Sequence, residues 1–282
     1  MALSTVKALN DAWKNNQKGQ WVPFLRIAAG TAVTLTPHTL WTATGLPGAG
    51  GNTTSGPANG RVLTSATAGA LPLIDPAPGE NLYLTGVRSY TSGPSASSLL
   101  LVDRISDCQI AHNEASGNFT GLTATSRLEA AGNGFDDGCM IWLEVTSGFS
   151  AASNTFNFTY TNSDGTGSRV TPNFNTLASQ SAGNSVIGAT GMFVPLQAGD
   201  RGVRSIESFT LVAGTGTGNF NVCLVRPLVW VPTLLIGYIE RDTAIQVVRP
   251  RRIYASSCLT FIHALGSANL PTLNGFLRLA SV

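Results

Sequence analysis

Residues 155–161 read Thr-Phe-Asn-Phe-Thr-Tyr-Thr, and this stretch decides the fold class of the chain. Its aromatic side chains occupy every second position, so a β-strand places them on one face and the polar side chains on the other. The stretch ends in Asn162-Ser163-Asp164-Gly165, a sequence typical of a tight turn. The pattern therefore predicts an antiparallel sheet with one buried face and one solvated face.

Comparable runs, bounded by turn residues, recur along the chain after Asn81. The further predicted strands are Leu82–Thr91, Leu99–Ile105, Cys139–Val145, Ser205–Val212, Asn219–Val225, Ile245–Val248 and Phe276–Leu279. Their connections differ in length and no repeat of fixed period is present, which argues against propellers and solenoids. We therefore predict a mainly β protein whose residues 76–282 form an antiparallel, two-sheet β-sandwich of the jelly-roll type.

Residues 1–75 are predicted to form a short N-terminal helix and an extended Gly-rich arm. Ser4 is placed to cap the first helical turn, and Val6, Leu9 and Trp13 recur at three- and four-residue spacing. This spacing predicts an amphipathic helix with a narrow apolar stripe. The stripe is expected to dock on its own domain or on another subunit.

A strand-like run, Trp21–Thr36, follows the predicted helix. The next segment, Trp41–Ala70, is rich in Gly, Thr, Ser, Asn and Pro and has no periodicity. A loop of this length is uncommon in a compact domain and is often functional. We expect an extended arm or an ordered long loop that contacts a neighbouring molecule.

The chain carries very few charges. Only 11% of its 282 residues are Asp, Glu, Lys or Arg, against roughly 25% in ordinary soluble domains. The net charge of +2 leaves no overall field that would attract nucleic acid or an anionic membrane, so neither is expected as a partner. A surface with so few charges is poorly protected against association, which favours a protein whose surface is covered by other molecules.

Cysteine spacing and the N-terminal sequence indicate the cellular compartment in which the chain is synthesised. Cys108, Cys139, Cys223 and Cys258 form no CxxC or Cys/His ligand pattern, and we expect buried free thiols in preference to disulfides. The N-terminus lacks the features of a secretory signal, so synthesis in a reducing host cytoplasm is expected. The apolar run Val222–Ile239 contains Arg226 and two prolines, which indicates two short buried strands and not a membrane helix.

Motifs for catalysis, metals and cofactors are weak, and none of these is expected. His112 follows Cys108, but a packed or surface histidine is a better explanation than a nucleophilic pair. A sugar hydrolase would have to use Asp136, Asp137 and Glu144, although Asp-Asp-Gly is ordinary turn chemistry. The sequence predicts a protein that is not an enzyme.

Candidate partner-binding residues lie at both ends of the chain. Three tryptophans, Trp13, Trp21 and Trp41, either anchor on a partner or are buried as the arm folds back on the sandwich. Leu46 and Pro47 begin the adaptable part of the arm. A basic cluster, made of Arg249, Arg251 and Arg252, is interpreted first as a contact for carboxylates of another subunit, with a solvated loop and nucleic acid as alternatives.

Four segments carry a resemblance to a known group of proteins. They are Leu40-Trp41-Thr42-Ala43-Thr44-Gly45-Leu46-Pro47-Gly48-Ala49-Gly50, Thr67-Ala68-Gly69-Ala70-Leu71-Pro72, Asn81-Leu82-Tyr83-Leu84 and Leu99-Leu100-Leu101-Val102-Asp103-Arg104-Ile105. The chain resembles tailed-bacteriophage virion proteins that are encoded near the major capsid protein and serve as head structural or cement subunits. The resemblance implies a binding surface and no active site.

The leading hypothesis is therefore a capsid cement or decoration subunit on the exterior of the virion. Its partners would be the major capsid protein and copies of itself, in a trimer or another symmetric cluster. Removal of residues 1–70 should abolish capsid binding and leave a folded sandwich. The alternative is a tail, receptor-binding or carbohydrate-binding β-sandwich module.

Overall fold

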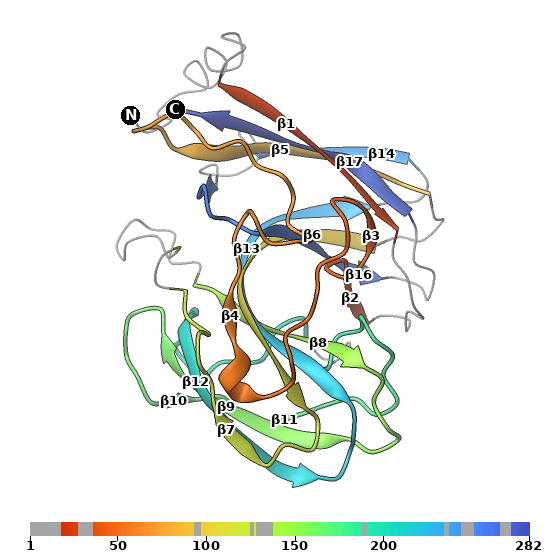
Figure 1. Cartoon of the computed structure of the whole chain (residues 1–282), viewed down its shortest axis with the longest axis vertical. Helices are drawn as coiled ribbons and strands as arrows, with labels where there is room; N and C mark the ends of the chain where they lie inside the picture. The colour runs from red at the N-terminus through yellow and green to blue at the C-terminus, as the bar shows by residue number, and fades with distance from the viewer. Residues whose placement is uncertain are drawn as a thin grey trace.

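The computed structural model describes residues 18–27, 36–92, 97–124, 127, 138–187, 191–233, 237–243, 251–265 and 272–282. Their backbone is mainly β and forms three antiparallel sheets, called here the upper, middle and lower sheets after their places in Figure 1. The prediction of a mainly β protein is confirmed. The predicted N-terminal helix and the predicted strand Ile245–Val248 lie outside the described residues.

The upper sheet joins strands from the two ends of the chain. Its order is β14-β5-β17-β1-β3, with β15 beside β5. The strands are β1 (Gly19–Ile27), β3 (Thr44–Leu46), β5 (Leu82–Thr91), β14 (Gly237–Asp242), β15 (Arg252–Ile253) and β17 (Thr272–Ser281). Because β1 lies between β17 and β3, the beginning of the predicted arm is part of a sheet.

The middle sheet has the order β2-β16-β6-β13-β8, with β4 beside β6. Its strands are β2 (Pro37–Thr39), β4 (Arg61–Val62), β6 (Ser97–Ala111), β8 (Met140–Ser147), β13 (Asn219–Thr233) and β16 (Leu259–Leu265). The lower sheet has the order β10-β9-β12-β7, with β11 beside β9. Its strands are β7 (Ser116–Asn118), β9 (Asn154–Asn162), β10 (Arg169–Val170), β11 (Phe174–Asn175) and β12 (Val203–Gly214).

The described residues form four hydrophobic clusters, and the two largest, called here the upper and lower cores, both use the middle sheet. The upper core packs Phe24 and Leu277 of the upper sheet with Leu101 of β6 and with other buried residues. The lower core packs Phe156 and Phe158 of β9 with the opposite end of the middle sheet. The predicted alternation along β9 is confirmed, because its aromatic side chains are buried and the residues between them are half-buried. The molecule thus differs from the predicted two-sheet sandwich by having a third sheet.

The long strands β6 and β13 connect the two cores. They pair along their length, with register shifts between Leu224 and Val225 and between Pro227 and Val229. Such irregularities bend a strand, and they accommodate a proline that an ordinary sheet interior would not. The apolar run Val222–Ile239 contains two strands, as predicted, but the first is the long strand β13, which continues to Thr233, and the second is β14, which begins at Gly237.

The bend places charged residues between the two cores. Asp103 and Arg104 of β6 are paired with Arg226 and Val225 of β13. We call this region between the two cores the waist. Successive residues of a strand point to opposite faces, so Asp103 and Arg104 serve different sides of the middle sheet. No helix in the described part of the chain is both long and apolar enough to cross a membrane.

Candidate functional site

The site centres on a long loop that is held against the middle sheet. We call residues 41–70 the strap; it contains β3, the short 3-10 helix η1 (Pro57–Asn59) and β4, and otherwise has no regular structure. Arg61 is the only charged residue within it. Since a loop without a sheet partner leaves buried backbone carbonyls without donors, other groups must satisfy them.

Arg26 of β1 satisfies several strap carbonyls at once. One guanidinium nitrogen, Nη1, donates to the carbonyl oxygens of Ala43 at 3.2 Å, Pro47 at 3.0 Å and Gly48 at 3.3 Å. The other, Nη2, donates to the carbonyl of Gly69 at 2.6 Å. This single side chain therefore ties the beginning of the strap to its end.

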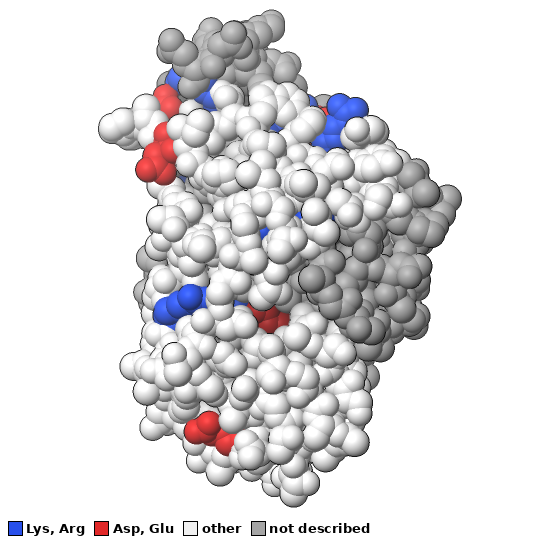
Figure 2. All heavy atoms as spheres, turned by 45° about the vertical axis from the view of Figure 1, so that its right-hand side comes forward, with Lys and Arg blue, Asp and Glu red and all other residues white. Residues whose placement is uncertain are grey.

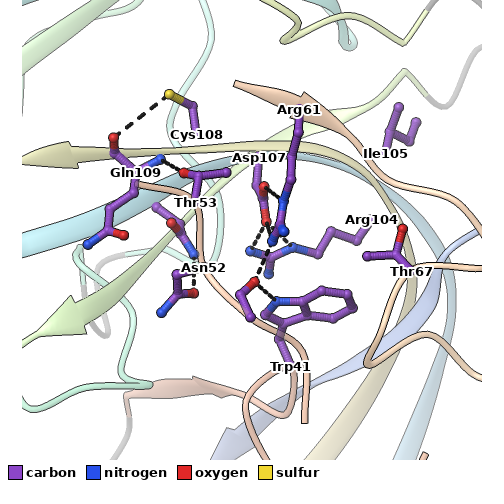
Figure 3. Close-up of polar contacts among 12 residues, drawn as sticks. Trp41, Asn52, Thr53, Arg61, Thr67, Arg104, Ile105, Asp107, Cys108 and Gln109 are labelled. Atoms are coloured by element: carbon purple, nitrogen blue, oxygen red, sulfur yellow. Dashed lines mark hydrogen bonds and ion pairs between the residues drawn. The ribbon is translucent and has the colours of Figure 1, made fainter. Parts of the chain in front are cut away.

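Trp41 and Arg104 form the centre of the second attachment (Figure 3). The Arg104 guanidinium lies 4.8 Å from the centre of the Trp41 ring, a cation–π contact between two buried groups. Arg104 also forms ion pairs with Asp107 at 2.8 Å and Glu144 at 2.7 Å. The strap's single aromatic ring is thus fixed on a buried ionic cluster of the middle sheet.

The next residues of the strap bond to the same cluster. Arg61 forms an ion pair with Asp107 at 2.8 Å and donates to the carbonyl of Gly51, which also accepts from the Trp41 indole at 3.1 Å. Thr53 accepts a hydrogen bond from the backbone N–H of Gln109 at 2.8 Å, as Figure 3 shows. These contacts satisfy polar groups of both the strap and β6.

A second ionic cluster lies on the other face of the waist. Asp103 forms ion pairs with Arg127 at 2.7 Å and Arg226 at 3.4 Å, and it accepts a hydrogen bond from Ser257 at 2.8 Å. Arg127 donates in turn to the carbonyl of Leu63 in the strap. Three arginines from distant parts of the chain, Arg26, Arg104 and Arg127, therefore hold the strap.

Glu144 and Arg26 are both charged at neutral pH although they are buried. Burial alone would raise the pKa of Glu144, but the charge and hydrogen bonds of Arg104, together with hydrogen bonds from Asn221 and Trp142, lower it to about 2. Burial lowers the pKa of Arg26 to about 10, which still leaves it protonated at neutral pH. Removing one member of such a buried cluster leaves the others without compensation.

The outer side of the strap is an exposed surface without an unpaired charge. Leu46 and Val62 are each 49% exposed, and most of the intervening residues are Gly, Ala, Thr, Ser and Asn. Most of the described surface in Figure 2 is likewise uncharged. The charged side chains that are buried in the described residues are Arg26, Asp103, Arg104, Asp107, Arg127, Glu144 and Arg226. Seven of the chain's 32 Lys, Arg, Asp and Glu residues are thus buried.

The predicted partner-binding tryptophans differ in how exposed they are. Trp41 is completely buried by its own chain, so it presents no surface to a partner, and the alternative in which the arm buries it holds. Trp21 is 55% exposed on the upper sheet, where its ring contacts Phe276. Trp13 lies outside the described residues.

The other predicted partner-binding residues fall in two places. Leu46 is exposed and Pro47 is half-buried in the strap. Arg251 and Arg252 are half-buried, and Arg252 stacks on Tyr254 with its guanidinium 4.7 Å from the ring centre. Arg249 lies outside the described residues. The strands that carry Trp21, Leu46 and Arg252 all belong to the upper sheet, as β1, β3 and β15.

The residues considered for catalysis have other contacts. Burial raises the pKa of the Cys108 thiol to about 12, and the thiol donates to the carbonyl of Gly56. His112 stacks on Phe149 with ring centres 3.9 Å apart and is hydrogen-bonded to Thr176. Glu144 is held in its ion pair with Arg104, whereas Asp136 and Asp137 lie outside the described residues. All four cysteines are buried and free, as predicted.

Within the described ranges, no group of three His, Cys, Asp or Glu side chains is arranged to hold a metal ion. Sequence reasoning missed the arginines that hold the strap. A signal was present at Val102-Asp103-Arg104-Ile105, where two charges interrupt an apolar run. Charges in such a position are rarely buried unless they are paired. Their partners lie far away in sequence, so the run alone could not identify them.

Comparisons with known proteins add little. No family model matches the chain, and no curated protein matches it. One solved structure, the crystal structure of the infectious bursal disease virus VP2 subviral particle, aligns with 8% identity and a TM-score of 0.20. The alignment covers 94% of this chain and 81% of that chain. The Gx strain of the same virus aligns with a TM-score of 0.19 and 8% identity, over 94% of this chain and 81% of that chain. TM-scores this low establish neither a shared fold nor a shared function.

Proposed function

We propose that this protein is a virion structural subunit, a capsid cement or decoration protein on the exterior of a tailed-bacteriophage head. It bridges subunits of the major capsid protein and associates with copies of itself. The observation that carries the proposal is the strap: an exposed loop with no unpaired charge, fixed from inside by buried arginines. The jelly-roll type of the sheets belongs to the same proposal.

The mechanism is burial of a preorganised surface. An ordered loop loses less conformational entropy on binding than a mobile one, and this strengthens association. The exposed strap side chains are small or apolar, so covering them removes no unpaired charge from water. A protein that binds only the assembled shell stabilises that shell by mass action.

Copy number in purified particles tests the proposed placement. Quantitative mass spectrometry should find hundreds of copies per virion, in a fixed ratio to the major capsid protein. A count of about six to twelve would indicate a neck or tail position and would contradict the cement assignment.

A charge placed on the strap tests the proposed surface. Leu46→Glu should reduce the number of copies bound to purified heads by tenfold or more, because a buried carboxylate would have no partner at the contact. Val212→Glu is the matched control, since Val212 is 47% exposed but lies on β12 of the lower sheet. Equal loss in both variants, or no loss in either, would overturn the assignment of the strap.

A second candidate is a receptor-binding or carbohydrate-binding module. It is favoured by the exposed rings of Trp21 and Tyr238, at 55% and 67% exposure, because sugar sites use exposed aromatic side chains. The adjacent rings Trp21 and Phe276 meet at 73°, so this pair does not form the flat platform on which a sugar ring would stack. Specific binding on a glycan array would support this candidate over the cement protein.

A further inference from the structure

The strap contains a dipeptide that is open to spontaneous chemical change. The chain has three Asn-Gly pairs, namely Asn59-Gly60, Asn133-Gly134 and Asn274-Gly275. The first lies at the end of η1 in the strap and the third lies in β17, whereas the second lies outside the described residues. In such a pair the glycine has no side chain to keep its backbone nitrogen away from the amide carbon of the preceding asparagine. The nitrogen can therefore react with that side chain wherever the backbone is free to rotate.

Asn59 lies in a part of the strap that is exposed and weakly held. None of the residues of η1 is buried. The side-chain nitrogen of Asn59, Nδ2, donates to the carbonyl of Ser55 at 3.2 Å, and its backbone N–H donates to the carbonyl of Gly56 at 3.0 Å. A single 3-10 turn without buried residues opens locally at a low free energy. Rotation of the backbone at Asn59 therefore requires no loss of core packing.

The fold requires a glycine at position 60, next to Asn59. A Cβ added to Gly60 would overlap the backbone carbonyl of Thr120, which passes directly beside the strap. A backbone group cannot move aside as the end of a flexible side chain does, so any other residue at position 60 would strain this contact. The path of the strap past Thr120 therefore retains the reactive pair.

The Asn-Gly pair in the upper sheet is held in the opposite way. Asn274 and Gly275 lie in β17, and each is paired with β5 on one side and with β1 on the other. Pairing on both sides fixes the extended backbone and uses its N–H groups in hydrogen bonds. A reaction at Asn274 would have to break this part of the sheet, so the same dipeptide is protected there.

We propose that Asn59 is a site of spontaneous deamidation, with water as the only other reactant. The backbone nitrogen of Gly60 attacks the side-chain carbonyl carbon, Cγ, of Asn59, and the new N–C bond closes a cyclic succinimide. The side-chain amide group leaves as ammonia and takes with it the proton that the Gly60 nitrogen loses. Water then adds to either carbonyl of the ring and breaks its bond to the ring nitrogen, which leaves aspartate or isoaspartate at position 59.

The products change the strap in two ways. Each adds a carboxylate to a segment in which Arg61 is the only charged residue. Isoaspartate also lengthens the main chain by one methylene group. Gly60 lies against Thr120, and Arg61 is held by its ion pair with Asp107 at 2.8 Å, so the added length should loosen η1 or these contacts. The modification goes beyond the proposed capsid role, since it requires no other macromolecule.

Peptide mapping of the full-length chain tests the proposal. The folded protein is stored at neutral pH and sampled over time, and mass spectrometry follows the conversion of the side-chain amide to an acid at Asn59 and at Asn274. Deamidation at Asn59 should be at least about tenfold faster than at Asn274, because only the second site requires the sheet to open. In urea, where the chain is unfolded, the two sites should react at similar rates. Equal rates in the folded protein, or a faster reaction at Asn274, would overturn the proposal.

Asn59→Ser is the matched variant, because serine has no amide and cannot close the ring. Storage should lower the thermal unfolding midpoint of the native protein, whereas stored Asn59→Ser protein, which retains Asn133 and Asn274, should keep the midpoint of its fresh sample. Freshly prepared Asn59→Asp protein measures the effect of the charge without the added backbone. An unchanged midpoint in native protein that carries isoaspartate at position 59 would contradict the loosening of the strap, and so would equal losses in the two stored proteins.

Discussion

The strap and the lower sheet are ordered by opposite means. In the lower sheet, β9 and β12 pair side by side and bury Phe156, Phe158 and Phe209, so apolar burial and strand pairing order the chain together. The strap has little pairing of its own and is held by guanidinium groups that bond to its carbonyls and stack on Trp41. Where strand pairing is missing, buried arginines supply the hydrogen bonds and ring contacts that order the chain.

The comparison explains why a chain with so few charges buries several of them. A buried carbonyl without a donor is costly, and an arginine supplies up to five N–H donors from one side chain. Arg26 thereby reaches strap residues that are up to 43 positions away in sequence. The cost is that each buried guanidinium requires its own compensation, which Asp103, Asp107 and Glu144 provide for Arg104 and Arg127.

The largest expected effect comes from breaking the ionic cluster under the strap. Arg104→Met should reduce the free energy of unfolding by about 3–5 kcal/mol, because Asp107 and Glu144 lose a buried partner. Urea unfolding measures this loss, and limited proteolysis should show earlier cleavage within residues 41–70. Arg169→Met in the lower sheet is the control; its ion pair with Asp200 is reached by solvent, so its loss should be smaller. Equal losses would remove the distinction between the two regions.

Acid should destabilise the fold through His263, which pairs across the middle sheet with His38, three residues before the strap. Burial and the nearby His38 lower the pKa of His263 from 6.5 to about 4. The unfolded chain therefore takes up a proton at higher pH than the folded chain does. Stability is complete above pH 6.5 and falls by about 3 kcal/mol from this group as the pH drops toward 4.

Urea unfolding at several pH values between 7 and 4 measures the histidine effect. His263→Gln should flatten the dependence, because glutamine does not titrate. His38 and His112 are also buried with lowered pKa values, so part of the slope should remain in this variant. Parallel pH profiles for the variant and the native chain would show that His263 does not contribute.

Adding a methyl group should destabilise the protein where the strap packs against Trp41 and have little effect where the strap faces open space. An ideal Cβ at Gly50 would lie 2.2 Å from Cε2 of the buried Trp41 ring, whereas one at Gly51 would meet nothing within 4 Å. Gly50→Ala should therefore lower the free energy of unfolding by about 1–3 kcal/mol through overpacking. Gly51→Ala, measured in the same thermal and urea unfolding experiments, should have little effect. If the two substitutions are equivalent, Trp41 is not packed on the strap as described.

The smallest expected effect is the loss of one threonine hydroxyl, and it is measured once in the strap and once in the lower sheet. Thr53→Ala leaves the backbone N–H of Gln109 without its acceptor and should cost about 1 kcal/mol in urea unfolding. Thr155→Ala removes a hydrogen bond to Asn175 that is exposed, so water replaces it and stability should change by less than about 0.5 kcal/mol. A larger loss at Thr155 than at Thr53 would reverse the comparison.

The regular strands were predictable because their signal is local. Leu82–Thr91 agrees with β5, and the predicted strand over residues 155–161 is one residue shorter than β9 at each end. Alternation and turn residues contain this information within a few positions. The same local patterns underestimated β6 and β13, because charged residues and Pro227 interrupt their apolar runs at the waist.

The arm was harder to predict because its contacts are distant in sequence. Removal of residues 1–70 was expected to leave a folded sandwich. In the structure that removal would take β1 from between β17 and β3, and with it Arg26 and Trp41. Point substitutions on the exposed strap are therefore the informative tests of capsid binding.

By itself, the sequence determined the β class of the described chain, the inward face of β9 and the scarcity of charge. Each depends on composition or on neighbouring residues, so no knowledge of the fold is required. Only the tertiary structure decided that Trp41 is internal, that three sheets share two cores and that buried arginines order the strap. Those outcomes depend on residues such as Asp103 and Arg127, or Arg26 and Gly69, meeting across long stretches of chain.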